Sequence, residues 1–181
     1  MLAVGAAACI ATLAGCSHAS KSTATTSKSS VTRCQIAHMR LSFGPLVSEA
    51  TGQSTVSVVL TNRLSHSCTL RGYPTIALLD GRSRKLSFSY SHHGDQMITS
   101  KKPAAVRVAA GGSAIFLFNK YRCDVRALNV ARTLRVALPG SDIVRPVRMQ
   151  QYPIITYCRQ APSLTVAVSP IERHLVDAFA H

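Results

Sequence analysis

The residues best suited to covalent chemistry are six cysteines, and their surroundings divide them into three groups. Cys9 lies in an apolar N-terminal run, and Cys16 directly follows Leu13-Ala14-Gly15. The other four lie in the body of the chain: Cys34, Cys68, Cys123 and Cys158. The sequence contains no Cys-x-x-Cys pair, which disfavours a zinc knuckle and a thioredoxin-like redox site.

The four body cysteines indicate two disulfides if the domain is exported, and three pairings exist. Pairing Cys34 with Cys68 and Cys123 with Cys158 closes two loops of similar size, with partners 34 and 35 residues apart. Each bond would stabilise the fold by about 3–4 kcal/mol in the chain-entropy description. We favour this pairing and a structural role, because no base or helix N-terminus that could activate a thiol is evident nearby.

Histidines and methionines are the next candidates, because imidazole and thioether groups suit Cu(I). The densest group is His92-His93 with Asp95, and the remaining residues of interest are His38, Met39, Met97 and Met149. Their spacing is not the one expected of a copper carrier, and a histidine pair beside Gly94 is typical of a solvated turn. We therefore predict neither a metal site nor a cofactor.

Acidic residues are scarce, which argues against an enzyme that uses carboxylates. The chain has 7 acids, and Asp80, Asp95 and Asp142 lie at or near turn glycines, where aspartate is expected for backbone reasons. Hydrolase, metalloprotease and nucleotide-binding motifs are absent. We predict a non-enzymatic protein; a hydrolase with an unrecognised site is the least favoured reading.

Basic residues dominate the charge, with 21 Lys and Arg against the 7 acids. Such a balance favours anionic partners, although a solvated basic surface explains it as well. Aromatic residues interleaved with the cations are too few for a surface that stacks nucleic-acid bases. Whether the basic clusters form one patch depends on the fold; they are Arg82-Ser83-Arg84-Lys85, Lys101-Lys102, Arg122 with Arg126, Arg132 with Arg135, and Arg145 with Arg148.

The N-terminal segments indicate export and anchoring. Residues 1–15 form an apolar run of signal-peptide length, and Leu13-Ala14-Gly15-Cys16 resembles the lipobox of bacterial lipoproteins. The resemblance implies a lipid on Cys16 and a place on the outer face of the cell membrane. Nucleic acid is then an improbable partner, and anionic lipid or polymer of the envelope, or another envelope protein, fits better.

Residues 16–33 are predicted to be the lipidated cysteine and a flexible tether. Ten of the seventeen residues from Ser17 to Arg33 are Ser or Thr, a composition that cannot bury apolar surface. Fully extended, these residues span at most ~56 Å.

The folded domain is predicted to span residues 34–181 and to be all-β. Apolar residues alternate with polar ones along many short runs, and turn residues separate these runs, which favours an antiparallel β-sandwich. The fully apolar run Ile115–Phe118 is typical of a central strand. After Pro170, apolar residues from Ile171 to Phe179 fit either a short amphipathic helix or a frayed tail.

The most distinctive stretch is Asn62 to Pro74, with Cys68 at its centre and Gly72-Tyr73-Pro74 at its end. Asn62 is suited to hold a turn with its side chain, Gly72 permits backbone angles denied to other residues, and Pro74 stiffens Tyr73. We interpret these residues as fold architecture.

This stretch, with Gly111-Gly112-Ser113-Ala114 further along, resembles the domain of unknown function 4232 family of exported actinobacterial proteins and lipoproteins. The resemblance covers roughly residues 34 to 169. It implies an immunoglobulin-like β-sandwich and no established activity.

Together these features predict a membrane-anchored lipoprotein whose β-sandwich is a non-enzymatic binding or envelope-interaction module. The alternative is a carrier or sensor of a small ligand, lipid or metal in a pocket of the sandwich.

Overall fold

The computed structural model describes residues 32–45, 47, 52–149 and 154–180. The predicted signal segment, Cys16 and almost all of the tether lie outside these residues. The described chain is all-β apart from two short 3-10 helices, η1 (Ile36–His38) and η3 (Leu175–Ala178). It contains no helix long and apolar enough to cross a membrane.

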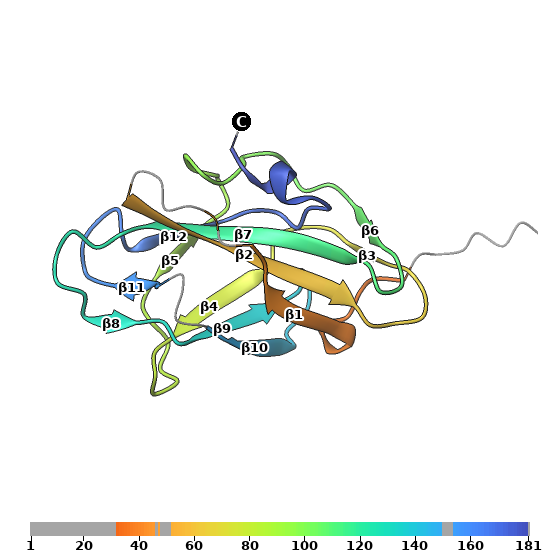
Figure 1. Cartoon of the computed structure of the whole chain (residues 1–181), viewed down its shortest axis with the longest axis horizontal. Coiled ribbons are helices and arrows are strands. Elements are labelled where there is room, and N and C mark those ends of the chain that lie inside the picture. Colours follow the sequence, from red (N-terminus) through yellow and green to blue (C-terminus); the bar gives the residue numbers. More distant parts are fainter. Residues whose placement is uncertain (1–31, 46, 48–51, 150–153, 181) are drawn as a thin grey trace, which may run out of the picture. The chain divides into compact units, whose positions relative to one another are not determined.

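The larger sheet has five strands in the order β1-β2-β7-β12-β5 (Figure 1). All neighbours are antiparallel except β12 and β5, which run parallel. Its strands are β1 (Met39–Phe43), β2 (Gln53–Asn62), β5 (Ser89–Ser91), β7 (Ser113–Tyr121) and β12 (Thr165–Val168).

A second sheet has the order β10-β9-β4, and two further strand pairs complete the described structure. The three strands of this sheet are β4 (Thr75–Leu79), β9 (Thr133–Ala137) and β10 (Val144–Arg148). The pairs are β3 (Cys68–Leu70) with β6 (Val106–Val108), and β8 (Asn129–Val130) with β11 (Thr156–Tyr157).

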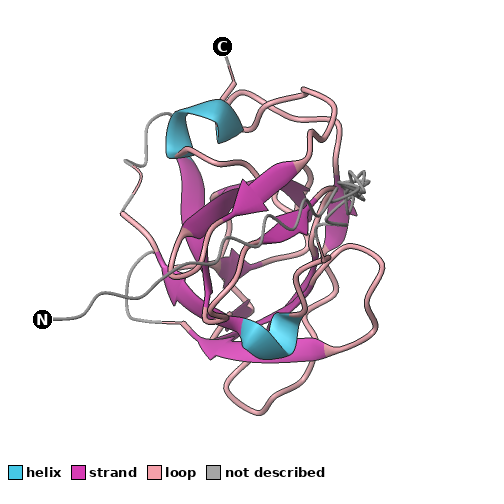
Figure 2. Ribbon diagram, turned by 90° about the vertical axis from the view of Figure 1, so that its right-hand side faces the viewer, coloured by secondary structure: helices cyan, strands magenta, loops and turns pink. Residues whose placement is uncertain are grey.

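The core forms where the two sheets face each other. Val58 of β2 is opposite Phe116 of β7, and both side chains are fully buried. Leu78 and Leu134, which are register partners on β4 and β9, enclose the same cluster from the second sheet. Figure 2 looks along the long axis and shows the strands arranged in layers. The predicted sandwich is therefore confirmed.

The larger sheet is covered on its other face as well, which explains the apolar run in β7. Leu117 points away from the main core and belongs to a smaller cluster with Ile98 and Ala178. β7 lies at the centre of the sheet, as its sequence predicts.

The C-terminal segment is extended near Ile171 and then forms only a short 3-10 helix, η3, in place of the amphipathic helix or frayed tail that its sequence suggested. Ile115 and Glu172 exchange two backbone hydrogen bonds of 2.8 and 2.7 Å, so residues near Ile171 stay extended against β7. Only η3 is helical. Pairing with the sheet overrides the weak amphipathic pattern, and burial of Ile171 and Ala178 keeps the segment from fraying.

Candidate anion-binding site

The loop after β4 is built around the carboxylate of Asp80. One oxygen, Oδ1, accepts backbone N–H groups from Arg82 at 2.8 Å and from Arg84 at 2.9 Å. The backbone N–H of Asp80 in turn donates to the carbonyl of Arg84 at 2.9 Å. The chain thus makes a tight turn in which Ser83 takes a left-handed φ of 60°. The sequence placed Asp80 in a turn, and the structure shows what it does there.

The second oxygen of Asp80 ties this loop to a distant segment. Oδ2 accepts from Nε of Arg84 at 2.9 Å and from the amide of Asn129, in β8, at 3.1 Å. The N–H groups of Arg84 and Arg82 and the Arg84 guanidinium lower the pKa of Asp80 to about 2, against the opposing effect of burial. Asp80 is 3% exposed, so its negative charge is compensated by these donors and little of it faces solvent.

Three adjoining grooves surround this loop. The first, of about 540 Å³, runs between Arg82 and Arg84 on one side and residues 127–130 with Arg132 on the other. The second, of about 940 Å³, lies between Asp80 and Arg148 and also contains Arg132. The third, of about 350 Å³, is lined by Lys85, Tyr157 and Arg159, and shares Leu128 with the first.

The groove linings are strongly basic. Among the described residues that line the three grooves, the only acid is Asp80, and the cations are Arg82, Arg84, Lys85, Arg132, Arg148 and Arg159. All six are exposed. The side chains of Arg82, Arg132 and Arg148 make no hydrogen bond or ion pair with any described residue. Guanidinium groups that line adjoining grooves and have no partner in the described part of the chain can bind phosphate or carboxylate through paired N–H donors.

A disulfide holds the far wall of the grooves. Cys123 and Cys158 are joined, with Cα atoms 6.1 Å apart, which links the loop after β7 to the segment of β11. The β8–β11 ladder extends this link, since Leu128 N donates to Tyr157 O at 2.8 Å and Ala131 N to Ile155 O at 2.8 Å. We call residues 80–87, 122–133, 146–149 and 154–159 the arginine end.

A buried cation lies near this end, on the last part of β7. Lys120 is 1% exposed, its ammonium donates to the carbonyl of Tyr121, and it lies 6.0 Å from the centre of the Phe88 ring. Burial lowers the pKa of Lys120 to about 8, so the group is mostly charged at neutral pH. It adds to the positive charge of this part of the molecule.

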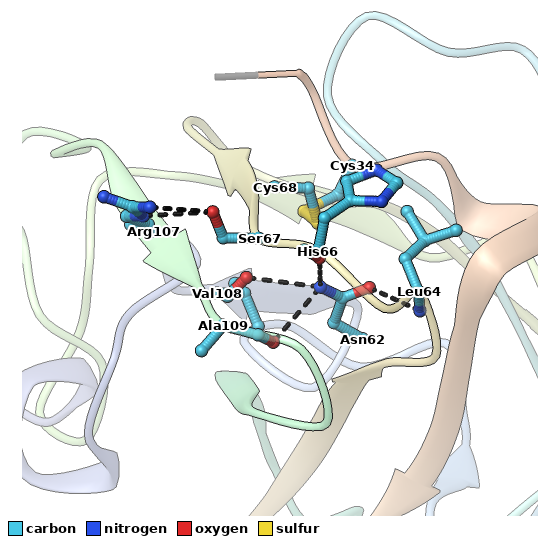
Figure 3. Close-up of a disulfide and its surroundings, with 9 residues drawn as sticks. All are labelled: Cys34, Asn62, Leu64, His66, Ser67, Cys68, Arg107, Val108 and Ala109. Atoms are coloured by element: carbon cyan, nitrogen blue, oxygen red, sulfur yellow. Dashed lines mark hydrogen bonds between the residues drawn. A yellow bond between two sulfur atoms is a disulfide. The ribbon is translucent and has the colours of Figure 1, made fainter. Parts of the chain in front are cut away.

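The stretch from Asn62 to Pro74 lies at the opposite end of the sandwich, where β3 and β6 meet (Figure 1). We call it, with Cys34, the Asn62 corner. Figure 3 shows the Asn62 amide nitrogen donating to the carbonyls of His66, Val108 and Ala109 at 2.8–3.2 Å, while its oxygen accepts Leu64 N.

The other residues of the Asn62 corner also make their contacts within the domain. The buried Cys34–Cys68 disulfide joins it to the start of the domain. Gly72 has a φ of 120°, and a Cβ there would lie 3.0 Å from Pro139. Tyr73 stacks on His92 with ring centroids 4.2 Å apart, and Pro74 is buried. Both predicted disulfides are thus present, and the contacts of this motif are made within the fold.

The cluster of His92, His93 and Asp95 also makes contacts within the domain. Burial, with a smaller effect of His93, lowers the pKa of His92. Asp95 accepts Met97 N and Ile98 N at 2.7 Å through one oxygen and the Asn119 amide at 2.7 Å through the other. Across the described residues, no three His, Cys, Asp or Glu side chains are placed to hold a metal ion.

The sequence identified several basic clusters but not their convergence. Arg132 and Arg148 line the second groove, whereas Arg145 donates to the carbonyl of Ala37 at 3.2 Å instead. Nothing in the sequence around Asn129 and Leu128 indicated that they line a groove. The predicted Cys123–Cys158 bond was the available clue, because it requires Arg126 and Arg159 to lie in neighbouring segments.

A family model described as Domain of unknown function (DUF4232) matches residues 34–171. No curated protein and no solved structure matches the chain.

Proposed function

The chain belongs to the family described as Domain of unknown function (DUF4232), and on that premise we propose that it is an exported, non-enzymatic binding module that holds an anionic ligand at the arginine end. The two disulfides suggest an extracellular or exported protein. In this proposal a lipid on Cys16 anchors the module to the outer face of the cell membrane.

One observation carries the binding part of the proposal. Arg82, Arg132 and Arg148 come from three separate segments, line adjoining grooves, and have no partner among the described residues. The acid between them is already ionised and satisfied by Arg84 and backbone N–H groups, so it neither needs nor neutralises these three guanidiniums. Uncommitted guanidiniums in a groove favour a ligand that carries several phosphate or carboxylate groups.

The test compares two triple variants that remove equal charge. The full chain with Cys16→Ser, which cannot be lipidated, would be passed over immobilised polyphosphate and over an uncharged resin in increasing salt. Replacing Arg82, Arg132 and Arg148 by Gln should abolish retention at moderate salt. Replacing Arg40, Arg63 and Arg71, which are exposed and lie outside the grooves, should lower it only slightly.

Equal losses in the two triple variants would show that retention reflects net charge alone. That result, or no retention of the unmodified arginine end at low salt, would contradict the proposal.

A further inference from the structure

The arginine end also exposes large apolar side chains. Leu128 is 61% exposed, Val125 is 52% exposed and Ile154 is 43% exposed. Three of the six large apolar side chains exposed among the described residues thus lie at this end, and an apolar group rimmed by charged residues marks an interaction surface.

Val125 and Leu128 are interspersed with cations in the chain. The loop after β7 reads Arg122-Cys123-Asp124-Val125-Arg126-Ala127-Leu128, with both arginines exposed and Asp124 as its acid. Leu128 itself forms a wall shared by two grooves, each of which also contains Arg84. Ile154 immediately precedes Ile155, whose carbonyl holds Ala131.

The loop is held in shape before any partner arrives. The Cys123–Cys158 disulfide closes it at one side, and the β8–β11 ladder follows directly after Leu128. Apolar tips on a stapled loop can enter another phase without a further cost in loop ordering.

From this arrangement we infer that the partner of the arginine end is an anionic lipid surface, with Leu128 and Val125 entering the headgroup layer while the surrounding arginines contact lipid phosphates. The inference rests on the proposed function, because the same arginines bind the anion. A soluble polyanion would engage the guanidiniums but leave the apolar side chains in water. A membrane interface accommodates both, since cations are attracted to anionic headgroups and apolar side chains reach the acyl boundary.

The first experiment uses the full chain with Cys16→Ser and sedimentation with vesicles of phosphatidylcholine, either alone or with 30% phosphatidylglycerol. Binding is expected only to the anionic vesicles and should fall with salt. Replacing Arg82, Arg132 and Arg148 by Gln should weaken it by roughly 100-fold, at about fivefold per cation. Replacing Leu128 and Val125 by Ser should weaken vesicle binding at least tenfold but leave polyphosphate retention unchanged.

The second experiment uses the absence of tryptophan from the chain, which makes an introduced one a unique reporter. Leu128→Trp should shift its emission to the blue on anionic vesicles and be quenched by brominated acyl chains. Val176→Trp is the matched control, because Val176 is 58% exposed on η3, outside the arginine end. Its emission should not change.

The outcomes separate the two proposals. Retention on polyphosphate without vesicle binding, or vesicle binding that the Leu128→Ser and Val125→Ser changes leave intact, would overturn the lipid inference and leave the anion site standing. If the protein with an unmodified arginine end binds neither polyphosphate nor anionic vesicles, both proposals are overturned. Equal quenching of Trp at Leu128 and Val176 would also overturn the lipid inference.

Discussion

Each end of the sandwich contains one disulfide, one polar side chain that gathers several backbone groups, and one turn glycine, but the two ends differ in what they leave free. At the Asn62 corner, the amide of Asn62 is fully used and the Cys34–Cys68 bond is buried. At the arginine end, the carboxylate of Asp80 is likewise held by hydrogen bonds, yet Arg82, Arg132 and Arg148 have no side-chain partner among the described residues. The hydrogen bonds of the Asn62 corner hold the fold together. Those of Asp80 hold a loop from which arginine side chains extend into solvent.

In the proposed function, the conspicuous motif and the binding surface lie in different parts of the molecule. The Asn62 corner has the more distinctive sequence, because turns and disulfides demand particular residue types. The arginine end has an ordinary sequence, because exposed arginines can be supplied by many positions. The four predictions that follow test this division, from the largest expected effect to the smallest.

The two disulfides should have equal effects on stability and unequal effects on binding. Their partners are 34 and 35 residues apart, so each should stabilise the fold by about 3–4 kcal/mol through the unfolded chain. Replacing Cys34 and Cys68 by Ala should lower the free energy of urea unfolding by that amount and preserve anion binding below the unfolding transition. Replacing Cys123 and Cys158 should lower both, and intact binding in this second variant would contradict the division.

One asparagine side chain from each end, Asn62 and Asn129, should differ in its effect on stability. Asn62→Ala removes three donated hydrogen bonds and leaves carbonyls of Val108 and Ala109 without this donor, which should cost about 2–4 kcal/mol. Asn129→Ala removes the hydrogen bond that its amide donates to Asp80, whose carboxylate keeps the donors of Arg84, and also the acceptor of the Val130 N–H. It should cost about 1 kcal/mol. Urea unfolding of both variants gives the two values. A larger loss of unfolding free energy for Asn129→Ala than for Asn62→Ala would contradict the view that the Asn62 corner is the more stabilising end.

The two turn glycines offer a smaller test. Gly72 combines a φ of 120° with a close approach to Pro139, so Gly72→Ala should cost about 1–3 kcal/mol. A Cβ on Gly81 would meet only Arg132 Cγ at an ordinary 3.8 Å, so Gly81→Ala should change stability by less than about 0.5 kcal/mol. Thermal unfolding is sufficient to rank them. Equal costs would show that the Asn62 corner is no more constrained than the arginine end.

The Asp80 loop should resist acid. The pKa of Asp80 falls from its ordinary 3.8 to about 2 in the folded state. Its stabilising effect is therefore complete above about pH 4 and is lost only as the pH falls through about 2. Carbon NMR of the Asp80 carboxyl should give a midpoint near 2, while amide signals of the Asn62 corner report on global folding. A midpoint near 4 with the corner intact would show that the loop does not hold the carboxylate.

The features that local sequence determines were predictable. The residue types of Asn62, Gly72 and Pro74 indicate their turn and corner roles. The distant partners of Asn62, Val108 and Ala109, depend on the fold, as does the approach of Gly72 to Pro139. The β7 run also revealed its central position, because a strand buried on both faces must be apolar throughout.

The arginine end was not predictable, because its parts lie far apart in the chain. The convergence of Arg82, Arg132 and Arg148 depends on the register of β4, β9 and β10 and on the bond from Asp80 to Asn129. None of these leaves a mark in the sequence. The C-terminal segment shows the same limitation, because its extended shape depends on pairing with Ile115.

The position of the two ends has a further consequence. Arg33, the last residue of the predicted tether, pairs with Thr69 of β3 and therefore lies at the end of the sandwich opposite the arginine end (Figure 1). If Cys16 carries the lipid that we propose, the module would have two attachment points on opposite poles. A tether of this length confines the free pole at an effective concentration on the order of millimolar. A surface with weak intrinsic affinity would then be bound to lipid much of the time and still dissociate rapidly. Changes in local lipid charge or salt would shift the arginine end between its bound and released states while the lipid on Cys16 keeps the domain attached.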